Sequence, residues 1–182
     1  MWRTLRVLAN PARLGLLRDV CTRPSQCVNA LAGRAGLGQP AATQHLRLLQ
    51  ARGLIRARRD SRWVFYTAEA DPLVAHAPAL LGAMQRALVK DRVALPAIAK
   101  AVTAFTHERR IRIVQAVVGG VDTPGRLAAA CRISTAALAR HLDKLERRGV
   151  LARGDGRVRL PPPATALAAA LLAVVKADGR AS

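Results

Sequence analysis

The chain has 182 residues, of which 51% are hydrophobic and only 3% aromatic, and 30 Lys and Arg against 11 Asp and Glu give a formal charge of +19. The excess is spread evenly, +10 over residues 1–92 and +9 over residues 93–182, which excludes a basic tail and favours a polyanionic partner such as nucleic acid. Three cysteines without a CxxC pair argue against a disulfide scaffold, and the most apolar run, residues 166–175, is too short to cross a bilayer.

The first predicted helix begins at Asn10 and Pro11, a capping residue followed by the imino acid that fits the first helical position. Apolar residues then recur at helical spacing, at Leu14, Leu17 and Cys21. The segment Thr22-Arg23-Pro24-Ser25 breaks this helix. Ser25 is expected to cap a second helix that runs through Ala35.

A third helix is predicted after the tight turn at residues 36–38, because Gln39-Pro40 again places a proline near a helix start. Its inward face carries Ala42, Leu46 and Leu49. Its outward face carries the candidate DNA-reading residues Gln39, Pro40, Thr43, Gln44 and Arg47. Two short helices joined by a glycine-containing turn form a helix-turn-helix signature, and Gln and Arg side chains bond the edges of adenine and guanine.

Period-two alternation predicts a β-hairpin of residues 54–58 and 63–67 around a turn at residues 59–62. Its candidate DNA-contacting residues are Arg56, Arg58, Arg59 and Arg62. A basic hairpin directly after a helix-turn-helix is a wing, placed to touch phosphates or the minor groove. A further helix is expected from Asp71-Pro72 through Leu73 to about Lys90, either as a pairing helix or as a helix that closes the core of its own unit.

An internal repeat predicts two winged-helix units, residues 1–92 and 93–182. Residues 45–54 and 141–150 both space leucines three apart and then place a glycine suited to a left-handed helix end, at an offset of 96. Earlier in each unit, residues 13–17 and 110–114 match at an offset of 97. We therefore expect a mainly α fold with small β-hairpins, built as tandem winged helix-turn-helix repeats.

The second unit is predicted to contain a helix capped by Thr106 and ended by Gly119-Gly120, a helix starting at Thr123-Pro124, and a last helix over residues 164–176. Where the first unit has Gln39, Pro40, Thr43, Gln44 and Arg47, the second has Thr135, Ala136, Ala139, Arg140 and Asp143. Because an aspartate repels phosphate, we expect base readout mainly from the first unit. The second is expected to contact mainly phosphates, or to bind no DNA and act as a partner domain. Its candidate contacts are Thr135, Arg140, Lys144, Arg153 and Arg157.

Several motifs of the first unit occur together: Leu8-Ala9-Asn10-Pro11-Ala12-Arg13-Leu14, Leu31-Ala32, Gly36-Leu37-Gly38-Gln39-Pro40-Ala41-Ala42-Thr43-Gln44-His45-Leu46 and Gly53-Leu54-Ile55. In this they resemble the bacterial ArsR family of winged-helix transcription factors, and the match covers nearly all of residues 5–70. The resemblance implies a dimeric DNA-binding repressor that pairs through its first and last helices. It also implies that release from DNA often depends on metal or thiol chemistry.

Few residues in this sequence are candidates for sensing a metal ion or an oxidant. Cys27 lies where metal-sensing relatives have the first cysteine of a Cys-Val-Cys motif, but the second position is Asn29. Cys21 and Cys27 are possible redox thiols only if their Cα atoms come within about 7 Å; otherwise they are small half-buried hydrophobes. The matched pair His45 and His141 belongs to the helix-turn-helix pattern, so we predict no metal site and no cofactor.

We expect a transcriptional regulator that binds double-stranded DNA, without enzymatic activity or a membrane partner. The N-terminal residues lack a long apolar core, so no secretory signal is expected, and the protein is placed in the cytoplasm with the nucleoid. A nucleoid protein that coats DNA without sequence choice, and a tandem winged-helix adaptor for protein partners, are the alternatives. The two units are expected to pair within one chain as a pseudo-dimer, with a homodimer as the competing arrangement.

Overall fold

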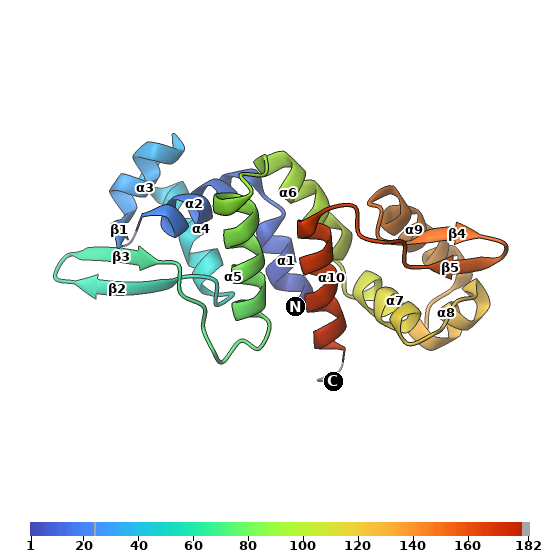
Figure 1. The fold of residues 1–182 in the computed structure, drawn as a ribbon. Coiled ribbons are helices and arrows are strands. Elements are labelled where there is room, and N and C mark those ends of the chain that lie inside the picture. The colour runs from blue at the N-terminus through green and yellow to red at the C-terminus, as the bar shows by residue number, and fades with distance from the viewer. Residues whose placement is uncertain (24, 180–182) are drawn as a thin grey trace.

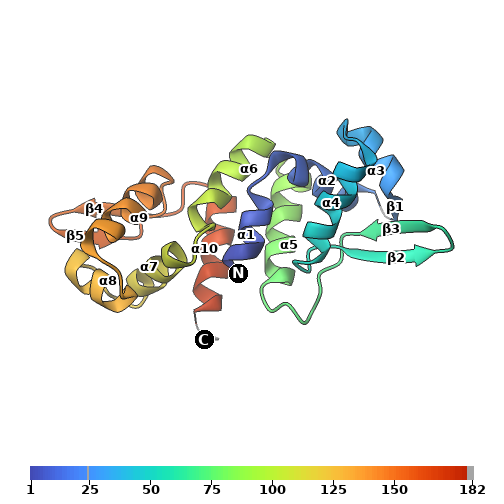
Figure 2. The same ribbon diagram turned by 180° about the vertical axis from the view of Figure 1, so that it is seen from behind.

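The protein is represented by a computed structural model, which describes residues 1–23 and 25–179. Pro24, part of the predicted helix break, and residues 180–182, the end of the predicted second unit, lie outside the described residues. Figures 1 and 2 show an elongated molecule in which helices occupy the middle and β-hairpins project at opposite ends. Within the described ranges, no helix is both long and apolar enough to span a membrane.

The first half of the chain begins with two helices, α1 (Trp2–Leu8) and α2 (Pro11–Thr22). A short strand, β1 (Gln26–Cys27), leads into the helices α3 (Val28–Ala35) and α4 (Gln39–Gln50). The hairpin strands β2 (Arg56–Asp60) and β3 (Trp63–Thr67) come next. The half ends with α5 (Ala77–Gln85), which continues as the π-helical turn η1 (Arg86–Lys90).

The second half follows nearly the same order of elements (Figure 1). It begins with α6 (Leu95–Val102) and the 3₁₀ turn η2 (Thr103–Phe105), followed by α7 (Glu108–Val118), α8 (Pro124–Cys131) and α9 (Thr135–Arg147). The strands β4 (Ala152–Gly154) and β5 (Arg157–Arg159) form the second hairpin, and α10 (Ala166–Asp178) closes the order. The predicted mainly helical fold with small β-hairpins is confirmed.

Several helix ends follow local side-chain chemistry as predicted. The side chain of Asn10 accepts a hydrogen bond from the backbone N–H of Arg13, with Pro11 at the first helical position of α2. Gly36 ends α3 with a left-handed φ of 62°, a conformation that costs glycine little. The hydroxyl of Ser134 caps α9 by accepting from the N–H of Ala137.

Two predicted helix caps are wrong. Ser25 does not cap α3, which begins at Val28, because the residues between them pair with β3 as the strand β1. In the second half the N-cap of α7 is His107 rather than Thr106. The Nδ1 atom of His107 accepts from the backbone N–H of Arg109 at 3.1 Å. A histidine ring acceptor thus replaces the hydroxyl that the sequence pattern favoured.

The helix after the first hairpin begins later than predicted. α5 starts at Ala77, whereas Asp71 lies in a turn in which its backbone N–H donates to the carbonyl of Gly53 at 2.9 Å. The carboxylate of Asp71 accepts from the N–H of Leu73, and the Leu73 side chain is 92% exposed instead of lying on a buried helical face. Similarly, α10 begins at Ala166, two residues after the predicted start at residue 164, and it extends to Asp178.

The first hairpin belongs to a three-stranded antiparallel sheet of order β1-β3-β2, and sequence analysis missed the strand β1. Asp60 pairs with Trp63 across the ladder, so Ser61 and Arg62 alone form the turn. Arg59 and Asp60, which were predicted in the turn, therefore lie in β2. The second hairpin pairs Gly154 with Arg157.

The middle of the molecule joins the two halves through their first and last helices. α5 contacts α10, α1 contacts α6, and α2 also contacts α6. Buried apolar side chains from both halves form one continuous cluster, to which the central helices contribute Leu5, Leu80, Met84, Ile98 and Leu171. In both views α4 and α9 lie on opposite sides of this central group (Figures 1 and 2).

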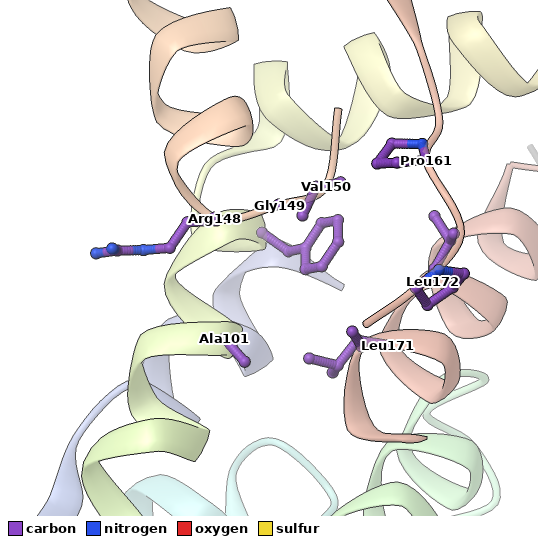
Figure 3. A pocket seen from close by; sticks show the side chains of 10 residues that line it. Ala101, Arg148, Gly149, Val150, Pro161, Leu171 and Leu172 are labelled. Atoms are coloured by element: carbon purple, nitrogen blue, oxygen red, sulfur yellow. The ribbon is translucent and has the colours of Figure 1, made fainter. Parts of the chain in front are cut away.

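A small cavity of about 30 Å³ lies between α6, the end of α9 and the start of α10. Figure 3 shows Ala101, Val150, Leu171 and Leu172 around it, with the guanidinium of Arg148 directed away. Arg148 Nε donates instead to the Thr103 hydroxyl at 2.8 Å. The cavity therefore offers an apolar lining and space for little more than two water molecules.

Candidate nucleic-acid interface

The helix α4 divides its side chains between the core and solvent as the sequence predicts. Ala42, Leu46 and Leu49 are fully buried, and α2 and α3 contact this helix. The opposite face is exposed, and it forms a shallow open hollow lined by Gln39, Pro40, Thr43, Gln44, Arg47, Leu48 and Ala51. We call this surface the α4 face.

The polar groups of the α4 face are available to an external partner. Within the described ranges, no hydrogen bond or ion pair engages the side chains of Gln39, Gln44 or Arg47. The Thr43 hydroxyl donates to the carbonyl of Gln39 at 2.8 Å, which leaves its methyl group and its lone pairs for other contacts. Burial raises the pKa of Tyr66 on the central strand β3, and the charge of Arg47 opposes that rise.

Two polar groups, on α2 and α4, lie toward the interior of the first half. Arg13 Nε donates to the carbonyl of Val7 at 2.5 Å, which ties α2 to the end of α1. Burial, and after it the charge of Arg13, lower the pKa of His45, which keeps this ring neutral near pH 7. The Nδ1 atom of His45 is buried and has no hydrogen-bond partner in the described part of the chain. The Nδ1 side of the His45 ring therefore faces the protein interior.

The hairpin β2–β3 carries the predicted wing arginines on an exposed ribbon. Arg56 forms an ion pair with Glu69 at 3.1 Å, and Arg58 lies 3.9 Å from Asp60. Near the tip, Arg59 Nε donates to the carbonyl of Ser61, and the Arg62 guanidinium lies over the ring of Trp63 at 5.3 Å. All of these contacts are at the surface, where such pairs are weak and a phosphate group can replace them.

The corresponding helix of the second half, α9, has a different surface. Thr135, Ala136, Ala139, Arg140 and Asp143 are exposed, while Leu138, Leu142 and Leu145 face the core. Lys144 is partly covered, and its pKa is lowered first by the charge of Arg148. This end of α9 is thus locally basic, although its exposed face offers fewer hydrogen-bonding groups than the α4 face.

The predicted contacts Arg153 and Arg157 of the second hairpin are held by the protein itself. The Arg153 guanidinium bonds both Asp143, at 2.7 Å, and Glu146, and its backbone N–H also donates to Glu146. These bonds lower the pKa of Glu146 and raise that of Arg153, so both groups stay charged near pH 7. Arg157 bonds Asp122. We call Arg153 with Asp143 and Glu146 the α9 clamp; sequence analysis missed it.

The possible redox thiols are unpaired, since Cys21 and Cys27 are both half-buried and free. Burial raises the pKa of Cys21 to about 11, which disfavours the reactive thiolate. Among the described residues there is no group of three or more His, Cys, Asp or Glu side chains placed to hold a metal ion. The rings of His107 and His141 lie 4.8 Å apart without a third ligand.

Comparisons with known proteins give relatives of one kind. No family model matches the chain. The nodulation protein NolR of Rhizobium meliloti is 39% identical over 70 residues, which cover 38% of this chain and 57% of NolR. The uncharacterized HTH-type transcriptional regulator MJ1325 of Methanocaldococcus jannaschii is 30% identical over 61 residues, covering 34% of this chain and 68% of the relative.

The HTH-type transcriptional repressor SmtB of Mycobacterium tuberculosis is 38% identical over 73 residues, which cover 40% of this chain and 52% of the repressor. The chain thus spans between about half and two thirds of the length of these curated relatives. Among solved structures, reduced HlyU from Vibrio cholerae N16961 is similar at 32% identity, with a TM-score of 0.35, over 43% of this chain and 81% of HlyU. Each of these matches covers less than half of the chain.

Proposed function

The chain belongs to the ArsR-like winged helix-turn-helix transcriptional regulators, and on that premise we propose that it represses transcription by binding a specific sequence of double-stranded DNA. The α4 face enters the major groove, and the arginines of β2–β3 contact the backbone or the minor groove beside it. The observation that carries the proposal is the α4 face itself, an exposed helical surface whose Gln and Arg side chains have no competing bond among the described residues.

The chemistry of the α4 face suits base readout. Gln44 and Gln39 each carry an amide that bonds adenine through two hydrogen bonds, and Arg47 bonds guanine in the same bidentate way. The methyl group of Thr43 suits the methyl group of thymine, since its hydroxyl hydrogen is already used within the helix. Pro40 stiffens the first turn of the helix, which fixes the direction in which these side chains leave it.

The wing supplies affinity without sequence choice. Arg56, Arg58, Arg59 and Arg62 exchange exposed intramolecular contacts for phosphates, with release of counterions from the DNA. The net charge of +19 acts in the same direction over the whole surface. Binding is therefore expected to weaken steeply as salt rises.

We further propose that residues 1–92 and 93–182 are two winged-helix units that pair within one chain. The contacts of α5 with α10 and of α1 with α6 support this arrangement, because they bury the helices through which the family resemblance implies pairing. Light scattering of free and DNA-bound protein tests it. The pseudo-dimer requires one 19.4 kDa chain in each state, whereas two chains would indicate the homodimer.

Selection of bound fragments from random duplex DNA, followed by two matched variants, tests the regulator proposal. Arg47→Ala is expected to cost about 1–3 kcal/mol on the selected site and to relax the preference at one base pair. Arg59→Ala is expected to weaken selected and random DNA alike and to reduce the salt slope by about 1. An unenriched pool, or equal losses on both kinds of DNA for both variants, would favour a nucleoid protein that coats DNA without sequence choice.

A further inference from the structure

We infer that the DNA site of this chain is not a palindrome: one half is read by the α4 face, and the other half is held loosely and with little sequence choice by the second unit. The inference rests on the proposed function and names the kind of DNA that it requires. Two identical units related by a two-fold axis bind a DNA site with two identical half-sites. The two halves of this chain place unlike surfaces at corresponding positions.

The first argument is the chemistry of the two helices. At the offset of 96 residues, Gln44 corresponds to Arg140 and Arg47 corresponds to Asp143. Thr43 corresponds to Ala139, which offers no hydrogen bond. The exposed face of α9 thus carries Thr135 and Arg140 in place of the two glutamines, the threonine and the arginine of α4. An α9 helix in the major groove has few groups with which to distinguish one base pair from another.

The second argument is the α9 clamp. Asp143, Glu146 and Arg153 correspond to Arg47, Gln50 and Ala57 in the first unit, a set without an acidic residue. The clamp thus places two carboxylates on the side of α9 that faces its hairpin. Arg153 bonds both carboxylates through Nε and Nη2, so two negative charges face its one positive charge. The net effect is to remove positive potential at the position where the first unit has Arg47.

The third argument concerns the rest of the second hairpin. Arg157 bonds Asp122, but its side chain is exposed, so like Arg56 of the first hairpin it can exchange this ion pair for a phosphate. Arg140 and Arg159 are exposed, and no hydrogen bond or ion pair to either side chain occurs within the described ranges. The second unit therefore keeps several cations for phosphates but presents fewer base-reading groups than the α4 face. Phosphate contacts hold and orient DNA without reading it.

The covalent connection makes this asymmetry a property of each molecule. Since α1 and α5 contact η2, α6 and α10 of the same chain, the strong and weak reading surfaces are fixed together. One molecule bound to DNA then contacts two major-groove segments about one helical turn, or about 10 base pairs, apart. Only one of the two segments is expected to carry a strong sequence preference.

Selection from random duplex DNA with the full chain, combined with the mass of the complex, tests the inference. The expected motif has one conserved half-site and a weakly conserved flank on one side only, with one chain per duplex. A base change in the conserved half should weaken binding at least about fivefold, whereas a change at the mirrored position should have less than about a twofold effect. A motif with two equal inverted halves overturns the inference but leaves the proposed function intact. A pool without any enriched motif overturns both.

The double variant Asp143→Asn with Glu146→Gln tests the clamp directly. Release of Arg153 should tighten binding to all duplexes and steepen the salt slope by about 1, the amount expected for one added phosphate contact. The control Glu108→Gln releases Arg112 from an ion pair within α7, outside both α9 and the second hairpin, and should leave the slope unchanged. Circular dichroism confirms that both variants fold. Unchanged binding by the folded double variant would contradict the role given to the clamp.

Discussion

At the scale of single residues, the glycines that follow α4 and α9 have the same backbone conformation in different surroundings. Gly53 has a φ of +67° and Gly149 a φ of +68°. A Cβ atom on Gly53 would lie 3.0 Å from side-chain atoms of both Asp71 and Val74, whereas a Cβ on Gly149 meets nothing within 4 Å. The longer connection before α5 fills the space over Gly53, whereas Gly149 is exposed and also lines the cavity of Figure 3.

This difference predicts unequal effects of the same substitution. Gly149→Ala should lower the free energy of unfolding by about 1–2 kcal/mol, the cost of a left-handed conformation for alanine. Gly53→Ala adds a steric clash to that cost, and a total loss of about 2–4 kcal/mol is expected. Urea unfolding of both variants measures the two values. Equal losses of unfolding free energy in the two variants would show that Val74 moves away from the added methyl group at no energetic cost.

Four histidines give stability a predictable dependence on pH. Burial is the first cause that lowers the pKa of His45, His76, His107 and His141, and nearby arginines lower the pKa of His107 and His141 further. The native protein therefore holds these rings neutral where the unfolded chain binds protons. Stability is fully present above about pH 6.5, the ordinary value for histidine, and is lost as pH falls below it.

Thermal melting between pH 7.5 and 5 measures this loss of stability. The variant His107→Asn tests the contribution of one of the histidines. Asn10 caps α2 at the corresponding place in the first half, so an asparagine at position 107 keeps a cap for α7 while removing one titrating ring next to His141. The variant should show a shallower fall in melting temperature on acidification. A fall in melting temperature as steep as that of the parent protein would show that His107 does not contribute to the pH dependence.

At the scale of elements, α10 joins the two halves because it contacts both α5 and α7. Leu171 on α10 is only 1% exposed and belongs to the continuous core. Its truncation therefore removes contacts that both halves share. Both tryptophans lie in the first half of the sequence: Trp63 on β3 reports on that half, whereas Trp2 also lines a hollow with residues of α7.

Leu171→Ala should destabilise the protein by about 2–5 kcal/mol, the usual range for a buried leucine. The same shift of the unfolding midpoint is expected in tryptophan fluorescence and in helical circular dichroism, because the core unfolds as one unit. The exposed substitution Ala173→Ser is the control on the same helix and should change little. An early loss of dichroism at an unchanged fluorescence midpoint would show that the halves unfold separately.

Some elements could be predicted from sequence because their causes are local. Asn10-Pro11 and Gln39-Pro40 start helices where the cap and the proline suffice. Asp71-Pro72 has the same pattern but starts only a single turn, closed by the N–H of Val74 on the carbonyl of Asp71, while the N–H of Asp71 ties this segment to the distant residue Gly53. The strand β1 escaped prediction for a similar reason: its two residues are extended only because β3 lies beside them.

At the scale of the whole molecule, the candidate site too could be predicted only where its causes are local in sequence. The outward residues of α4 could be predicted from helical spacing, since their direction depends only on which positions are buried. The α9 clamp depends on how the second hairpin lies against α9, so Arg153 was predicted as a phosphate contact. The spacing of Asp143 and Glu146, three apart on one helical face, was the signal that an arginine of the following hairpin had acidic partners.

Both the two-unit proposal and the asymmetric DNA site depend on the arrangement of the whole chain. One continuous core joins two halves of nearly equal positive charge, yet in the second half Asp143 and Glu146 of α9 and the nearby Asp122 bond arginines of the hairpin. Equal net charge therefore does not mean equal capacity to read DNA. We expect overall affinity to follow the charge of the chain, and sequence choice to follow the α4 face.

Methylation interference on the selected DNA site most directly tests whether α4 lies in the major groove. Methylation of guanine N7 blocks the atom that a bidentate arginine contacts there. We predict that methylation at one guanine of the conserved half-site abolishes binding of the parent protein, and that Arg47→Ala is insensitive to methylation at that guanine. Binding of the parent protein that is indifferent to N7 methylation throughout the site, or a pattern that Arg47→Ala leaves unchanged, would contradict the account.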